Sequence, residues 1–160
     1  MSEAPGARGR DETELERYDR NLTELMGELR VALPGVQVLF GFLLVAPFNA
    51  RFGHTTHFER RLYFAALLLT LLASILLIGP TMLHRLAFRE GRKAYVVELG
   101  NRLTIAGLAV LAVAITCAIA LVTHYMFGQT TAIVTTAATA TVFVLVWFAV
   151  PTRWRHQTGD

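Results

Sequence analysis

Hydrophobic residues along this chain form four long stretches that no charged side chain interrupts. None of the four contains Asp, Glu, Lys or Arg. A helix needs about 20 mostly apolar residues to cross a hydrocarbon core about 30 Å thick, and each stretch reaches that length. The pattern therefore predicts four transmembrane segments, at residues 31–50, 62–83, 103–123 and 130–150.

The four stretches are apolar on every side, which favours helices over strands. A segment in hydrocarbon must satisfy its own backbone hydrogen bonds, so it is either a helix or part of a closed barrel. Barrel strands alternate polar and apolar residues over about ten positions. The predicted fold is therefore an all-α integral membrane bundle of four transmembrane helices, with residues 31–150 as one domain.

The polar region before the first stretch divides in two. Residues 1–10 are rich in Gly, Pro and charge, which predicts a disordered tail without a cleavable signal peptide. Residues 11–33 predict a cytoplasmic amphipathic helix that ends before Pro34. Its apolar residues recur every three or four positions, and they are Leu15, Tyr18, Leu22, Leu25 and Leu29. Two alternatives stay open: this stripe packs on its own bundle or the membrane interface, or it joins two subunits.

Charge gives the expected orientation. Only 17% of the 160 residues are charged while 54% are apolar, too little charge to cover a soluble domain. The basic residues split twelve against three between alternate sides of the predicted spans. The three are Arg51, Arg60 and Arg61. The positive-inside rule then predicts a cell-membrane protein with both termini, including the tail at 151–160, in the cytoplasm.

Basic and acidic residues gather at the cytoplasmic edges of the spans. The expected interface charges are Glu28, Arg30, Arg85, Arg89, Arg92 and Lys93. They suit anionic lipid headgroups, so membrane lipids are the expected partner and nucleic acid is not. Glu28 and Glu98 are expected to pair with Arg30 and Arg102 nearby.

The polar residues inside the spans are the positions where function would show. Gln37, Gly41, Val45 and Asn49 are four apart and share one face, which we expect to turn toward other helices. Gln37 is expected to hydrogen-bond to a neighbouring helix. Pro47 lies among them and predicts a local bend.

The second span contains a candidate hinge, Gly79-Pro80, close to its cytoplasmic end. The third and fourth spans carry small residues four apart, which allow helices to approach closely. These are Ala112, Thr116 and Ala120 on the third, and Thr131, Thr135 and Thr139 beside Ala132, Thr136 and Ala140 on the fourth. We interpret them as packing surfaces rather than a conduction path.

No motif in the sequence points to catalysis. There is no GxSxG, HExxH, Walker loop or paired-carboxylate arrangement. His54 and His57 could hold part of a metal site, but no third ligand lies near them in the sequence. The single cysteine, Cys117, excludes a disulfide within one chain. We therefore expect no enzyme activity, no cofactor and no metal.

The order of segments resembles a known family. Three segments occur in this order: ERYDRNLTELMGELRVALPGVQVLFGFLLVAPF, then FERRLYFAALLLTLLASILLIGPTMLHRLAFREGRK, then GNRL at the third span. Together they are similar to small actinobacterial membrane proteins catalogued as a domain of unknown function. The resemblance covers residues 16–151. Some relatives carry an automatic sodium:proton antiporter label, and the family supplies no catalytic or binding residues.

Antiport usually needs an intramembrane carboxylate that exchanges a proton for a cation, and the four predicted spans contain none. The function expected from the sequence is therefore a structural, regulatory or partner-binding membrane component. An oligomeric transporter or channel for small cations or protons is the alternative, and a homo-oligomer or a membrane protein partner is open in both cases.

Overall fold

Helices account for nearly all of the described chain. The computed structural model describes residues 13–87 and 93–149. Its elements are α1 (Glu14–Val45), η1 (Ala46–Phe48), η2 (Ala50–His54), α2 (His57–Ala87), α3 (Lys93–Phe127), α4 (Gln129–Val144) and the short π-helix η3 (Leu145–Ala149). No strand occurs within the two described ranges, which confirms the all-α prediction.

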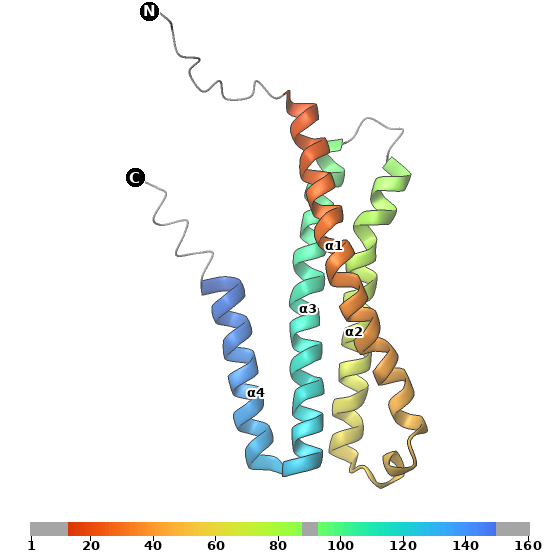
Figure 1. Cartoon of the computed structure of the whole chain (residues 1–160), viewed down its shortest axis with the longest axis vertical. Helices are drawn as coiled ribbons and strands as arrows, with labels where there is room; N and C mark the ends of the chain where they lie inside the picture. The colour runs from red at the N-terminus through yellow and green to blue at the C-terminus, as the bar shows by residue number, and fades with distance from the viewer. Residues whose placement is uncertain (1–12, 88–92, 150–160) are drawn as a thin grey trace, which may run out of the picture.

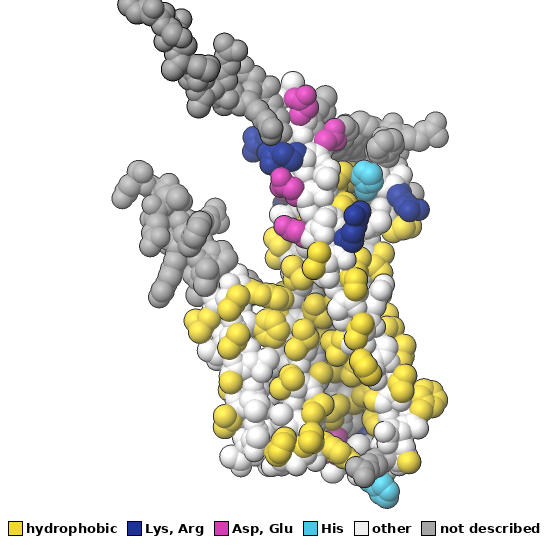
Figure 2. Space-filling view, viewed as in Figure 1, with side chains coloured by type: hydrophobic (Ala, Val, Ile, Leu, Met, Phe, Trp, Pro, Cys, Tyr) yellow, Lys and Arg dark blue, Asp and Glu magenta, His cyan; other side chains and the backbone are white. Residues whose placement is uncertain are grey.

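Four helices are long and apolar enough to cross a membrane, which confirms the predicted transmembrane architecture. They extend over Glu16–Phe48, His57–Arg85, Tyr95–Phe127 and Gln129–Trp147. On the face drawn in Figure 2, charged side chains gather near the end of the bundle at which α1 begins. Hydrophobic side chains are spread over the rest of this face, as lipid contact requires.

A capping box starts α1 at Thr13. The Thr13 hydroxyl accepts a hydrogen bond from the Glu16 backbone N–H at 3.3 Å, and the Glu16 carboxylate accepts one from the Thr13 backbone N–H at 2.9 Å. Two N–H groups that a helix start leaves open are thereby satisfied. The sequence pattern predicts a helix start in this region, and the capping box shows that the helix begins at Glu14.

The expected helix end near Leu33 is not seen. α1 continues through Pro34 to Val45, so one helix stands where a separate amphipathic helix and a first span were expected. Proline removes one N–H donor, and neighbouring structure can compensate for that loss in membrane helices. A separate amphipathic helix is therefore not confirmed. The predicted tails at 1–10 and 151–160 lie outside the described residues.

One seam of α1 forms the core contact with α2. Leu29, Val36 and Leu43 lie seven residues apart and are all buried, and a seven-residue repeat keeps them on one side of the helix. Leu29 and Val36 cluster with Leu25 and with Leu77 of α2. The C-terminal half of the predicted leucine stripe thus packs on the protein's own bundle, whereas the side chain of Leu15 lies outside the described residues.

A second cluster holds the other end of α1. Leu43 packs with Tyr63 and Ala66 of α2. The Tyr63 hydroxyl donates a hydrogen bond to the Leu43 backbone carbonyl at 2.9 Å. This carbonyl lies in the last turn of α1, where four carbonyls lack a partner within the helix. Tyr63 therefore combines apolar burial with a cap on α1.

The closest helix packing is between α2 and α3. A Cβ at Gly107 would lie 2.8 Å from Leu77 Cγ, so only glycine fits against this fully buried leucine. The candidate hinge belongs to the same contact: a Cβ at Gly79 would lie 3.0 Å from Leu103 Cδ1, and Pro80 is buried beside Gly100. α2 remains helical through both residues to Ala87, so the structure gives them a packing role. Hinge motion at Gly79-Pro80 stays a prediction.

α4 has a single neighbour among the described helices. It packs against α3 and makes no packing contact with α1 or α2 within the described chain. Figure 1 shows α4 beside α3, on the side away from α1 and α2. The connection is one residue, Gly128, whose φ of 85° is readily adopted only by glycine. The bundle is therefore open along one side of α4.

Candidate functional site

A buried carboxylate lies at the start of α2, at the end of the bundle opposite the start of α1. The Glu59 side chain is 7% exposed. Its Oε2 accepts a hydrogen bond from the Thr56 backbone N–H at 2.7 Å and one from the Thr56 hydroxyl at 3.0 Å. The Thr56 hydroxyl in turn accepts from the Glu59 backbone N–H at 3.3 Å. This is a capping box, and it explains why α2 begins at His57.

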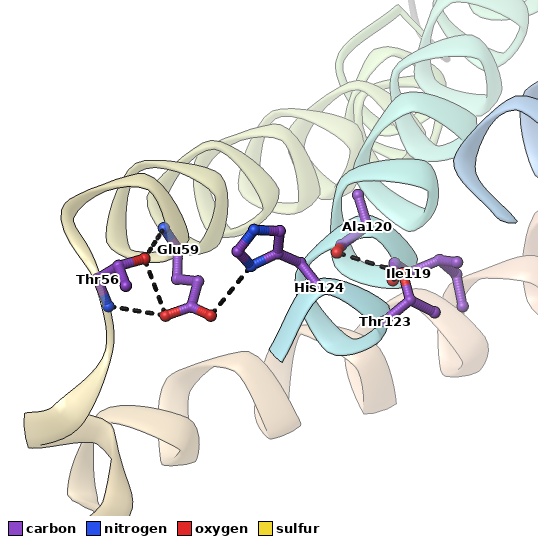
Figure 3. Close-up of polar contacts among 6 residues, drawn as sticks. All are labelled: Thr56, Glu59, Ile119, Ala120, Thr123 and His124. Carbon is purple, nitrogen blue, oxygen red and sulfur yellow. Dashed lines mark hydrogen bonds and ion pairs between the residues drawn. The ribbon is translucent and has the colours of Figure 1, made fainter. Parts of the chain in front are cut away.

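The other oxygen of the same carboxylate reaches α3. Glu59 Oε1 lies 3.1 Å from Nδ1 of His124, in the last turns of α3 (Figure 3). An ionised carboxylate only accepts hydrogen bonds, so Nδ1 carries the proton of this contact. The ring of Phe58 packs against the imidazole with centroids 5.2 Å apart. The contact joins residues 65 positions apart and fixes the start of α2 to the end of α3.

The residue before His124 joins α3 to α4. The Thr135 hydroxyl of α4 lies 3.1 Å from the Thr123 hydroxyl, to which it donates, and the Thr123 hydroxyl donates to the Ile119 carbonyl at 2.7 Å. Consecutive residues on a helix point about 100° apart. Thr123 and His124 therefore hold two different neighbours, α4 and α2, at one level of the bundle.

An open groove lies between α2 and α4, with α3 as its floor. It encloses about 780 Å³. We call it the α2/α4 groove, and it is lined by Thr56, Phe58, Leu62, Ala120, His124, Gln129, Ala132, Ile133, Thr136, Ala137 and Ala140. The wall from α4 includes Ala132, Thr136 and Ala140, four residues apart. Ala132 of this small-residue surface is buried within the described chain, whereas Thr136 and Ala140 are half-buried and border the open groove.

A second groove of about 640 Å³ lies between α1 and α3 near the same end of the bundle. Asn49, a predicted polar site, lines this groove with Phe42, Tyr63 and Tyr125. Pro47 lies in η1, the 3-10 turn that follows the end of α1 at Val45. The bend predicted at Pro47 thus corresponds to the end of the α-helix.

The expectation that Gln37 faces the bundle is wrong. Gln37 is exposed, as are Gly41, Val45 and Asn49 on the same predicted face. The inward side of α1 is set by the seam through Val36, and Gln37 is one residue, about 100°, farther round the helix. Its amide therefore points away from α2 and α3, and the predicted hydrogen bond to a neighbouring helix does not form within the described chain.

The interface charges are exposed where the structure describes them. Glu98 pairs with Arg102 four residues later, as expected. Glu28 and Arg30 are exposed and do not pair with each other in the described chain, because residues two apart on a helix face different directions. Arg85 is exposed in the last turn of α2. Arg89 and Arg92 lie outside the described residues, as does the side chain of Lys93, the first residue of α3.

Histidines at 54 and 57 are both exposed. Within the described residues, no three His, Cys, Asp or Glu side chains form a group that could hold a metal ion.

Sequence reasoning missed Glu59 and His124. The expected second span began at Leu62, whereas the helix able to cross the membrane begins at His57 and so includes a carboxylate. One local signal was available, because Thr56-x-x-Glu59 before an apolar run is a capping-box pattern. Nothing local indicates His124 as its partner, since the contact depends on how α2 packs on α3.

Comparison with curated proteins finds no match, and comparison with solved structures finds none either. A family model described as "Family of unknown function (DUF6328)" matches residues 11–151, which include all four transmembrane helices and the Glu59–His124 contact. The chain belongs to this family of unknown function.

Proposed function

We propose that this protein is a non-enzymatic component of the cell membrane whose α2/α4 groove binds a transmembrane helix of another membrane protein. The observation that carries the proposal is the packing of α4 against α3 alone in the described chain. This arrangement leaves Ala132, Thr136 and Ala140 beside an open space. Small residues four apart are the surface against which transmembrane helices pack most closely.

The dimensions and chemistry of the groove support a helix as the occupant. From Gln129 to Ala140 the α4 wall is about 17 Å long, three turns of helix. The lining also contains polar groups, from Thr136, Gln129 and His124. A lipid acyl chain offers them no hydrogen bond, whereas the side chains of a partner helix can.

Crosslinking in native membranes tests the occupant. A single cysteine in place of Thr136, in a Cys117→Ala background, is expected to give one discrete adduct with another membrane protein. The matched control is Val134→Cys, since Val134 is 63% exposed and does not line the groove. Adding Ala140→Leu to the Thr136→Cys chain should fill the groove and reduce the adduct several-fold.

Four results would contradict this proposal. Thr136→Cys and Val134→Cys could give the same adducts, or adducts of Thr136→Cys could be unaffected by Ala140→Leu. Cation or proton flux through the purified chain in liposomes would instead favour the transport alternative, for which Glu59 would be the titratable intramembrane group. An adduct of twice the chain mass would show that the groove receives a second copy of this chain.

Orientation is part of the same proposal. The twelve-to-three division of basic residues supports an orientation with both termini in the cytoplasm. Single cysteines at Thr56 and Gln129, in the Cys117→Ala background, should then react with a membrane-impermeant thiol reagent in whole cells. A cysteine at Ala94 should react only after the membrane is opened. Labelling at Ala94 in intact cells would overturn the orientation.

A further inference from the structure

The outward side of α1 carries a polar side chain at membrane depth. Gln37 is exposed, and no described residue hydrogen-bonds to its amide. It lies seven residues beyond Arg30 and eight before the end of α1 at Val45. With a rise of about 1.5 Å per residue, the amide is about 10 Å from the nearest charged residue along the helix. Gln37 is therefore inside the hydrocarbon layer.

Lipid leaves this amide without partners. A glutamine side chain has two N–H donors and one carbonyl acceptor, and an amide left unpaired in hydrocarbon costs several kcal/mol. Residues three or four positions away share its face of the helix, and none of them has a polar side chain; they are Leu33, Pro34, Phe40 and Gly41. A protein surface that hydrogen-bonds to Gln37 would remove this cost.

The surface around Gln37 has room for a second helix. Gly41 follows one turn later, and a Cβ built there would meet nothing within 4 Å. Pro34 precedes one turn earlier and is exposed. Neither residue has a long side chain that would hold a neighbouring helix away. A helix in this position could approach near enough for its polar groups to reach the Gln37 amide.

We propose that two copies of this chain pair through this face of α1, with the two Gln37 amides hydrogen-bonded to each other. Copies inserted in the same orientation are related by a two-fold axis along the membrane normal, which brings equivalent residues together at one depth. The glutamine amide is both donor and acceptor and so is complementary to itself. A second copy always has a glutamine at the same depth in the membrane. A different protein need not have one there.

This dimer uses α1, whereas the proposed partner site uses α2 and α4, so each proposal can fail alone. The experiment is oxidative disulfide crosslinking of Gly41→Cys in native membranes, in a Cys117→Ala background. A product of twice the chain mass is expected. Phe42→Cys is the matched control, because Phe42 is adjacent and 74% exposed but points about 100° away from Gly41.

Variants at Gln37 test the hydrogen bond. Membrane hydrogen bonds of this kind correspond to a weakening of roughly 3- to 30-fold when removed, so Gln37→Leu should reduce Gly41→Cys crosslinking by that factor. Gln37→Asn keeps the amide and should retain part of the crosslinking. Because Gln37 is exposed in the single chain, the melting temperature of the detergent-solubilised monomer should be the same for Gln37→Leu and the unsubstituted chain.

Several outcomes would overturn the dimer. They are equal crosslinking at Gly41→Cys and Phe42→Cys, crosslinking unaffected by Gln37→Leu, and a Gly41→Cys adduct with a different protein. A lowered melting temperature of the monomeric Gln37→Leu variant would show instead that Gln37 serves its own chain.

Discussion

Leu29→Asp should unfold the cluster that packs the N-terminal half of α1 against α2. Leu29 is 2% exposed and packs with Leu25, Val36 and Leu77. The substitution removes apolar contacts and buries a carboxylate that has no cation beside it in this cluster. Deleting such a leucine side chain alone costs about 2–5 kcal/mol, and an unpaired buried charge adds to that. We expect a large loss of thermal stability in detergent, or failure to recover folded protein.

Arg17→Ala is the matched control for this experiment, since Arg17 lies on the same helix and is exposed. Its melting temperature should stay within experimental error of the unsubstituted chain, because exposed substitutions usually change stability by less than about 0.5 kcal/mol. Equal melting temperatures for Leu29→Asp and Arg17→Ala would show that the N-terminal half of α1 is not packed on the bundle.

Glu59→Leu should produce the second large effect. The substitution removes the acceptor of the Thr56 backbone N–H and of the Thr56 hydroxyl, together with the contact to His124 on α3. Loss of a helix cap costs about 0.5–2 kcal/mol, and loss of a hydrogen bond to a charged group costs about 1.5–3 kcal/mol. After allowance for the gain in apolar burial, we expect a net loss of about 2–3 kcal/mol in the free energy of unfolding, measured in detergent.

Two variants isolate the cause of this loss. Glu59→Gln keeps a carbonyl acceptor and should recover part of the stability. Glu98→Gln removes an exposed carboxylate from its pair with Arg102, and an exposed pair of this spacing contributes about 0.3–0.5 kcal/mol. If Glu59→Leu proved as mild as Glu98→Gln, the Glu59–His124 contact would not hold α2 to α3.

The transmembrane architecture could be predicted from the sequence because it depends on composition within single segments. Four uncharged stretches of sufficient length have no other stable solution in lipid than helices or a closed barrel. The boundaries were less predictable. Pro34 predicted a helix end, but α1 continues through it, and α2 begins five residues before Leu62 because of the capping box at Thr56.

The inward side of α1 and the Glu59–His124 contact could not be predicted from sequence patterns for a different reason. Gln37 was expected to face inward because it is polar, yet the direction of each α1 residue follows from the seam through Leu29, Val36 and Leu43. Polarity cannot locate that seam. Glu59 and His124 are 65 residues apart, and only the packing of α2 on α3 brings them within 3.1 Å.

The attachment of α4 to one neighbour has a consequence for the order of assembly. A chain is made from its N-terminus, so α1, α2 and α3 can enter the membrane and pack before α4 has been synthesised. The contacts among these three helices do not require α4. Docking of α4 on α3 is then a late and separable event, and we expect α4 to have the lowest opening free energy in the bundle. Amide hydrogen exchange measures the opening of each helix separately. A helix bound between α2 and α4 should slow amide exchange in α4 more than in any other helix.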